Sequence, residues 1–203
     1  MDNIEKELEA GRAVILPTET VYGIFAKALD QEAVDYIYEL KRRPRDKALN
    51  LNVADEKTIR IYSKNQPSYL TKLIHSFLPG PLTIILQANE KVPNWIHSGL
   101  DTVGFRIPAH PKTLDLIRKF GPLVGPSANL SGHASGTKYQ TIISEFDQVV
   151  PGIEDDDFLT GQDSTILDIS SSKSRILRQG SITKADLLAQ VPELSFEEDD
   201  LPQ

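Results

Sequence analysis

The hydrophobic residues of this chain fall into two spacings, one typical of helices and one typical of strands. Helical spacing predicts helices near residues 3–10, 31–43, 68–77, 112–120 and 137–146, and a last one after Thr183. In the second helix we expect Asp30 to cap the first turn and Pro44 to end the last, because a residue before proline avoids the helical region. We also expect Thr137 to cap the fifth helix, and Thr183 with Asp186 to form a capping box.

Alternating or continuous apolar runs predict strands at residues 13–16, 49–53, 82–86, 103–107, 122–125, 165–169 and 175–177. Strands alternate with helices along the chain, but some strands follow each other directly. This order predicts an α/β fold with a twisted, mixed sheet and helices packed on both faces, rather than a purely parallel doubly wound fold.

No internal repeat or low-complexity linker divides the chain, so we expect one domain over residues 1–194 and an acidic tail at 195–203. The 203 residues include 39% hydrophobic and 25% charged residues, which is typical of a globular protein. The chain has no cysteine, which excludes disulfides, thiolate metal sites and cysteine nucleophiles and fits a reducing cytoplasm. The N-terminus is acidic and every apolar run is short, so we expect a cytoplasmic protein without a membrane role.

The net charge of −7 is unevenly spread, and five bases lie within the seven positions 41–47. Favourable interaction with a helix dipole, worth roughly 0.3–1 kcal/mol for each cation, does not require so many. A polyphosphate site explains the density better, with Arg43 as a bidentate donor and Lys41 and Lys47 as mobile point charges. A solvated surface and nucleic-acid contact are the alternatives, although no aromatic residues for base stacking are interleaved with these bases.

Standard nucleotide and hydrolase motifs do not account for a site in this sequence. It contains no Gly-x-x-x-x-Gly-Lys-Ser/Thr loop, no Gly-x-Gly-x-x-Gly after a strand and no Gly-x-Ser-x-Gly, and its four histidines lack metal-ligand spacing. Polar turns remain at 17–23 and 126–132, where each follows an apolar run. Each is either an ordinary self-capped turn or part of a site.

Arg106 stands out because it lies in an apolar strand, on the same side as Thr102 and Gly104. A buried arginine needs an anionic partner, which is either an internal carboxylate or a ligand. An internal salt bridge is the default expectation from the sequence alone. Ser164 and Arg178 follow in two later polar segments.

Taken together, these segments resemble the YrdC/TsaC-like family of threonylcarbamoyl-AMP synthases. The resemblance rests on seven motifs in order, namely Pro-Thr-Glu-Thr-Val-Tyr-Gly at 17–23, Lys-x-Arg-Pro at 41–44, Pro-Gly-Pro-Leu-Thr at 79–83, Arg-Ile-Pro-Ala-His-Pro at 106–111, Pro-Ser-Ala-Asn-x-Ser-Gly at 126–132, Ser-Thr-Ile-x-Asp at 164–168 and Ile-Leu-Arg-x-Gly at 176–180. Each motif is weak alone, but their common order over most of the chain is specific.

The resemblance implies a three-layer fold with a concave, positively charged site. It implies an enzyme that makes threonylcarbamoyl-adenylate from L-threonine, bicarbonate and ATP, with Mg²⁺ as a helper ion whose ligands the sequence does not mark. Other proteins would use this product to modify tRNA at position 37.

Carried over by position, the resemblance implies that Lys41, Arg43, Ser127 and Asn129 form the catalytic signature. ATP would be bound by Arg43, Lys47, Thr102, Asn129, Thr137 and Arg178, and threonine by Thr20, Asn52, Arg106, Ser127 and Ser164. Two positions depart from the family pattern, because Ala48 replaces a common proline and Asn52 replaces a histidine found in some relatives. The alternatives are a non-catalytic RNA-binding protein of the same fold, and a paralogous carbamoyl-transfer or nucleotide-binding protein that has lost threonine specificity. Weak RNA contact is a further expectation for the enzyme.

Overall fold

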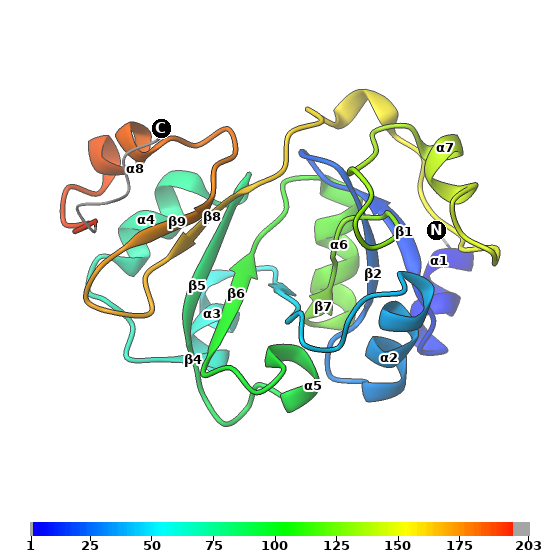
Figure 1. Cartoon of the computed structure of the whole chain (residues 1–203), viewed down its shortest axis with the longest axis horizontal. Coiled ribbons are helices and arrows are strands. Elements are labelled where there is room, and N and C mark those ends of the chain that lie inside the picture. The colour runs from blue at the N-terminus through cyan, green and yellow to red at the C-terminus, as the bar shows by residue number, and fades with distance from the viewer. Residues whose placement is uncertain (1, 197–203) are drawn as a thin grey trace.

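One open sheet of nine strands runs through the computed structural model, which describes residues 2–196 (Figure 1). Its strands are β1 (Val14–Pro17), β2 (Tyr22–Lys27), β3 (Leu51–Asn52), β4 (Ser63–Lys64), β5 (Leu82–Ala88), β6 (Thr102–Arg106), β7 (Leu123–Val124), β8 (Thr165–Asp168) and β9 (Arg175–Arg178). They are paired in the order β1-β2-β7-β3-β6-β5-β8-β9, and β4 pairs with β5. The pairs β3–β6 and β5–β8 are parallel and the others are antiparallel, so the predicted mixed sheet is confirmed.

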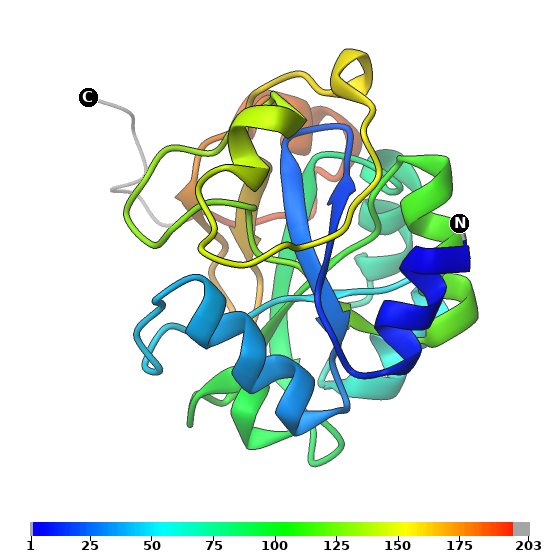
Figure 2. The same cartoon turned by 90° about the vertical axis from the view of Figure 1, so that its right-hand side faces the viewer.

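Helices cover both faces of this sheet, as predicted. They are α1 (Asp2–Glu9), α2 (Gln31–Leu40), α3 (Glu56–Tyr62), α4 (Leu70–Phe77), α5 (Asn94–His97), α6 (Pro111–Phe120), α7 (Tyr139–Ile143) and α8 (Lys184–Gln190), with a short 3-10 turn at Asp156–Phe158. Strand β2 shows the layering: Phe25 packs in a cluster with residues of α1 and α6, whereas Ile24 packs in the larger cluster that includes α2. Figure 2 shows α1 and α6 on one side of β1 and β2, and α2 on the other.

Side-chain caps begin two of these helices where the sequence predicts them. The carboxylate of Asp30 accepts a hydrogen bond from the backbone N–H of Ala33, at 3.2 Å. Thr183 and Asp186 form the predicted capping box at the start of α8. Both interactions satisfy backbone donors that the first turn of a helix leaves free.

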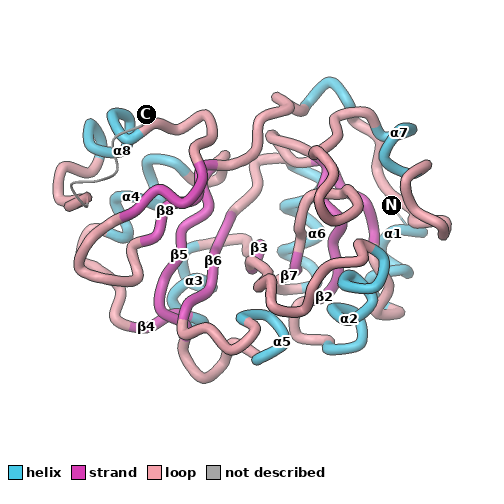
Figure 3. The backbone as a smooth tube through the Cα atoms, viewed as in Figure 1, coloured by secondary structure: helices cyan, strands magenta, loops and turns pink. Residues whose placement is uncertain are grey.

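Two predicted helix ends are wrong. Helix α2 ends at Leu40 rather than at Pro44, because Lys41 is its C-cap and Arg42 turns into the left-handed region with a φ of 49°. Helix α7 is shorter than predicted, and Lys138, which makes no side-chain cap, precedes it instead of Thr137. The chain between β7 and β8 is mostly loop (Figure 3), so few helical hydrogen bonds form there.

The predictions also missed several elements, namely β2, α3, β4 and α5. Of the predicted acidic tail, residues 197–203 lie outside the described part of the chain, and the carbonyl of Ser195 accepts a hydrogen bond from the N–H of Ser174, at 2.7 Å. Within residues 2–196, the helices are all too short or too polar to cross a membrane.

Candidate functional site

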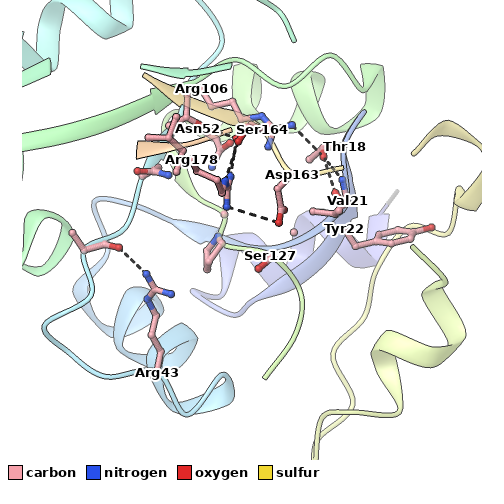
Figure 4. A pocket seen from close by; sticks show the side chains of 17 residues that line it. Thr18, Val21, Tyr22, Arg43, Asn52, Arg106, Ser127, Asp163, Ser164 and Arg178 are labelled. Atoms are coloured by element: carbon pink, nitrogen blue, oxygen red, sulfur yellow. Dashed lines mark hydrogen bonds and ion pairs between the residues drawn. The ribbon is translucent and has the colours of Figure 1, made fainter. Parts of the chain in front are cut away.

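A cavity of about 280 Å³ lies at strand ends of the sheet, and it is lined by residues from eight strands or the turns next to them and from the segment after α2 (Figure 4). Its lining residues are Thr18, Val21, Tyr22, Gly23, Arg43, Ala48, Asn50, Asn52, Thr83, Arg106, Gly125, Pro126, Ser127, Asp163, Ser164, Ile166 and Arg178. Pockets that bind small ligands lie preferentially at such edges, where several strands end together. We refer to this cavity as the central pocket.

Lys41 lies behind the central pocket rather than in it. Its side chain is buried, and its ammonium group donates hydrogen bonds to the backbone carbonyls of Ser127, at 2.6 Å, and of Asn129. The N–H of Ser131 returns a bond to the carbonyl of Lys41, at 2.9 Å. The expectation of a mobile point charge at Lys41 is therefore wrong, since this residue ties the end of α2 to the loop that carries Ser127.

Burial also changes the acid–base chemistry of Lys41. Removal of the ammonium group from water lowers its pKa to about 8, and the neighbouring positive charge of Arg43 acts in the same direction. The charge of Glu145 opposes this shift without cancelling it. The buried lysine is therefore much easier to deprotonate than an exposed one.

Arg43 is the one base of the 41–47 run that lines the central pocket. Its guanidinium donates to the carbonyls of Lys47, at 3.2 Å, and Ala48, at 2.9 Å, which fixes the side chain without neutralising it. Arg42 and Arg45 instead pair with Asp147 and Asp35. Of the five basic residues at 41–47, one arginine lines the pocket, one lysine is buried and the other three are exposed.

Arg106 reaches the central pocket from the end of β6, and the internal salt bridge expected for it is present. Its terminal nitrogen Nη2 lies 2.7 Å from a carboxylate oxygen of Glu19 and 2.6 Å from the hydroxyl of Thr20. The Nε of the same guanidinium is buried and has no hydrogen-bond partner among the described residues. The Nε–H of this arginine is therefore a buried donor without a hydrogen bond in the described part of the chain.

Arg178 holds Ser164 where β8 and β9 border the pocket. Its guanidinium donates to the carbonyl and the hydroxyl of Ser164, both at 3.0 Å, and lies 3.9 Å from a carboxylate oxygen of Asp163. The Ser164 hydroxyl also lies 2.9 Å from that of Thr83. This network fixes two hydroxyls and one guanidinium at the ends of β5, β8 and β9.

Two asparagines of the β3 region line the floor of the pocket, and glycines make room for them. A Cβ at Gly125 would lie 2.7 Å from the amide nitrogen of Asn52, and one at Gly104 would lie 2.1 Å from the amide oxygen of Asn50. These glycines therefore let both amides lie against the sheet. Asn52 is one of the predicted site residues and Asn50 is not, although alternation along the strand places both on one face.

The structure brings six of the twelve predicted site residues to the central pocket, namely Arg43, Asn52, Arg106, Ser127, Ser164 and Arg178. The other six are not among its lining residues. Thr20, Lys41 and Asn129 are buried and bond to neighbouring groups, Thr102 pairs with Gln87 at the start of β6, Lys47 is exposed, and Thr137 lies in the loop before α7. Four further residues with hydroxyl or carboxylate side chains line the pocket and were not predicted from the sequence, namely Thr18, Tyr22, Thr83 and Asp163.

Three arginines and a single carboxylate, that of Asp163, line the central pocket, whereas the chain as a whole carries a net charge of −7. The lining of the pocket therefore carries more basic than acidic side chains. Among residues 2–196, no group of three or more acidic or histidine side chains is placed to hold a metal ion alone.

The fold and the pocket define a class: an α/β protein with an open mixed sheet and an arginine-lined ligand pocket at the strand ends. A family model for Sua5, YciO and YrdC proteins, described as "Telomere recombination", matches residues 6–180. The chain belongs to this family.

Comparison with individual proteins agrees with this assignment. The chain is 38% identical to the threonylcarbamoyl-AMP synthases of Pyrococcus abyssi and Bacillus subtilis, over 86% and 90% of its length. It spans about half the length of these relatives, 52% and 54% respectively. The crystal structure of P. abyssi Sua5 complexed with L-threonine superposes with a TM-score of 0.88 at 35% identity, covering 95% of this chain and 57% of that one.

Proposed function

We propose that this chain makes threonylcarbamoyl-adenylate from L-threonine, bicarbonate and ATP, with release of pyrophosphate. The observation that carries the proposal is the pocket wall of Arg43, Arg106 and Arg178, which suits substrates that bear a carboxylate and a triphosphate. The names of the two relatives at 38% identity and the L-threonine complex of the P. abyssi protein support the same substrates here.

L-Threonine would occupy the side of the pocket near Arg106. Arg106 lines the pocket, and a guanidinium group is well suited to bind the carboxylate of an amino acid. The other residues assigned to threonine are Thr20, Asn52, Ser127 and Ser164. Of these, Thr20 acts through its bond to Arg106, and the remaining three line the pocket.

ATP would lie toward Arg43 and Arg178, with its negative phosphates against their guanidinium groups. Lys47, Thr102, Asn129 and Thr137 complete the assignment for ATP. Mg²⁺ is commonly held by one or two carboxylates together with substrate phosphates, and Asp163 is the pocket residue that fits this requirement. The bound ion would supply further positive charge to the triphosphate.

The reaction requires positioning and charge neutralisation more than a nucleophilic side chain. The amine of threonine and bicarbonate combine into a carbamate with loss of water. A carbamate oxygen then forms a bond to the α-phosphorus as the bond to pyrophosphate breaks. Arg43 and Ser127 would contact the reacting groups, while Lys41 and Asn129 position the loop that carries Ser127.

The adenylate would pass to other proteins that modify tRNA at position 37, and we propose that the reaction takes place in the cytoplasm. A non-catalytic RNA-binding role is less well supported, because Arg42 and Arg45 are paired with acidic residues instead of forming a free cationic surface. Weak RNA contact would then fall on exposed lysines such as Lys47.

Detection of the product tests this proposal. The protein is incubated with ATP, L-threonine, Mg²⁺ and ¹³C-bicarbonate, and the mixture is analysed by mass spectrometry. The proposal requires an adenylate that carries both the threonine mass and one ¹³C atom. An adenylate without the label, or AMP alone, would contradict it.

A further inference from the structure

Glu19 makes a two-point contact with the segment that carries Arg106. One carboxylate oxygen accepts from Nη2 of Arg106, at 2.7 Å, and the other accepts from the backbone N–H of Ala109, at 2.8 Å. The side chains of Glu19 and Arg106 are only 14% and 12% exposed. Because Ala109 lies three residues after Arg106, the carboxylate is anchored at both ends to the connection between β6 and α6.

The hydrogen bonds of the Arg106 guanidinium are concentrated on one of its nitrogens. Nη2 is near three acceptors, Glu19 and Thr20 at bonding distance and the hydroxyl of Thr18 at 3.5 Å. The buried Nε has none in residues 2–196. Glu19 is not among the residues that line the central pocket, whereas Arg106 is. The glutamate thus acts on the pocket only through the arginine.

We propose that Glu19 is a positioning residue that sets the affinity for the amino-acid substrate by fixing the guanidinium of Arg106. Held at Nη2, the planar group cannot rotate freely about its long side chain, so the guanidinium that lines the pocket meets the substrate carboxylate in one orientation. This inference rests on the proposed function, because it assigns the carboxylate of threonine to Arg106.

A competing role for Glu19 has the opposite consequence. A carboxylate beside an arginine also reduces its positive charge, and charge reduction alone would weaken the attraction of any anion. The backbone N–H of Ala109 already shares the negative charge of Glu19, which favours orientation as the main effect. The two roles predict changes of opposite sign when the glutamate is removed.

The variants Glu19→Ala and Glu19→Gln separate these roles in a steady-state pyrophosphate-release assay. For Glu19→Ala we expect the KM for threonine to rise on the order of tenfold, while the KM for ATP stays within about twofold. Glu19→Gln retains one acceptor for Arg106, so its KM for threonine should lie between those of the wild type and of Glu19→Ala. Glu7→Ala is the matched control. Glu7 lies on α1 and also pairs with an arginine, Arg12, and neither residue lines the pocket.

L-Threoninamide, which lacks the carboxylate, supplies a second measurement. The preference for threonine over its amide should shrink about tenfold in Glu19→Ala and remain unchanged in Glu7→Ala. A lower or unchanged KM for threonine in Glu19→Ala, or an equal rise for ATP, would overturn the inference while leaving the proposed function intact. If the wild-type protein releases pyrophosphate without threonine, the proposed function itself fails, and the inference fails with it. Should Glu19→Ala not fold, Glu19→Gln and the amide comparison decide.

Discussion

The ammonium group of Lys41 lies 2.6 Å from the backbone carbonyl of Ser127, a residue 86 positions later in the chain. Together with the bond from the N–H of Ser131 to the carbonyl of Lys41, this contact joins the end of α2 to the loop at 126–132. The two most conspicuous polar motifs of the sequence therefore form one structural unit. Arg43 projects from one side of it and Ser127 from the other, both toward the central pocket.

Loss of this link should misplace the loop. We predict that Lys41→Met lowers the rate of pyrophosphate release at least about 100-fold, because small displacements in an active site cost that much. Lys41→Arg should not restore it, since the larger guanidinium does not fit the buried position. The matched control is Lys91→Met at an exposed lysine, which should behave as wild type. Near-normal activity of Lys41→Met would remove this residue from the positioning role.

The lowered pKa of Lys41 predicts a dependence of stability on pH. Between the folded pKa of about 8 and the ordinary value of 10.5, the unfolded chain binds a proton that the folded protein does not. The free energy of unfolding of the wild type, relative to that of Lys41→Met, should therefore rise by about 2 to 3 kcal/mol across this range. Urea denaturation at several pH values measures the difference, and a flat difference would contradict the lowered pKa.

Arg178 is predicted to matter through Ser164 as well as through its charge. Arg178→Ala removes two hydrogen bonds to Ser164, so the KM for ATP should rise at least about tenfold and the KM for threonine should rise too. The control is Arg175→Ala on the same strand, because Arg175 pairs with Asp168 outside the pocket lining. If Arg178→Ala and Arg175→Ala raised the KM values by the same small factor, Arg178 would have no specific role in substrate binding.

Gly180, the last residue of the Ile-Leu-Arg-x-Gly motif, permits a close backbone contact. A Cβ at this position would lie 2.3 Å from the carbonyl of Asp163 and 2.5 Å from the N–H nitrogen of Thr165. Gly180→Ala should therefore lower the free energy of unfolding by about 1–3 kcal/mol and reduce activity, since backbone must move. The exposed neighbour supplies the control, with Ser181→Ala expected to stay within about 0.5 kcal/mol. An unchanged denaturation midpoint in Gly180→Ala would contradict this prediction, because it would show that the backbone at 163–165 can move aside at little cost.

The sequence predicted those elements whose signals are local. The cap at Asp30, the capping box at Thr183 and the strand around Phe105 depend on neighbouring residues alone, and all three are present. Strand β2 was missed because both of its faces are buried, so its residues show no alternation. Helix α3 was missed although its start carries a signal, a cap in which Asp55 accepts from the N–H of Thr58, at 2.7 Å.

The site shows the same division between local and long-range information. The strand position of Arg106 indicated a buried arginine with an acidic partner, but nothing local identified Glu19 as that partner. The role of Lys41 depends on carbonyl groups that only the folded chain brings near it. Tertiary contacts of this kind leave no periodic pattern in the sequence.

The central claim is that the arginine-lined pocket joins ATP to threonine through bicarbonate, and one measurement tests it most directly. Pyrophosphate release is followed for the wild type, Arg43→Ala and Arg45→Ala, with threonine or bicarbonate omitted in turn. We predict release by the wild type only when both are present, a loss of at least about 100-fold in Arg43→Ala, and wild-type rates in Arg45→Ala, whose side chain pairs with Asp35. Release that continues without threonine, or that survives in Arg43→Ala, would contradict the claim.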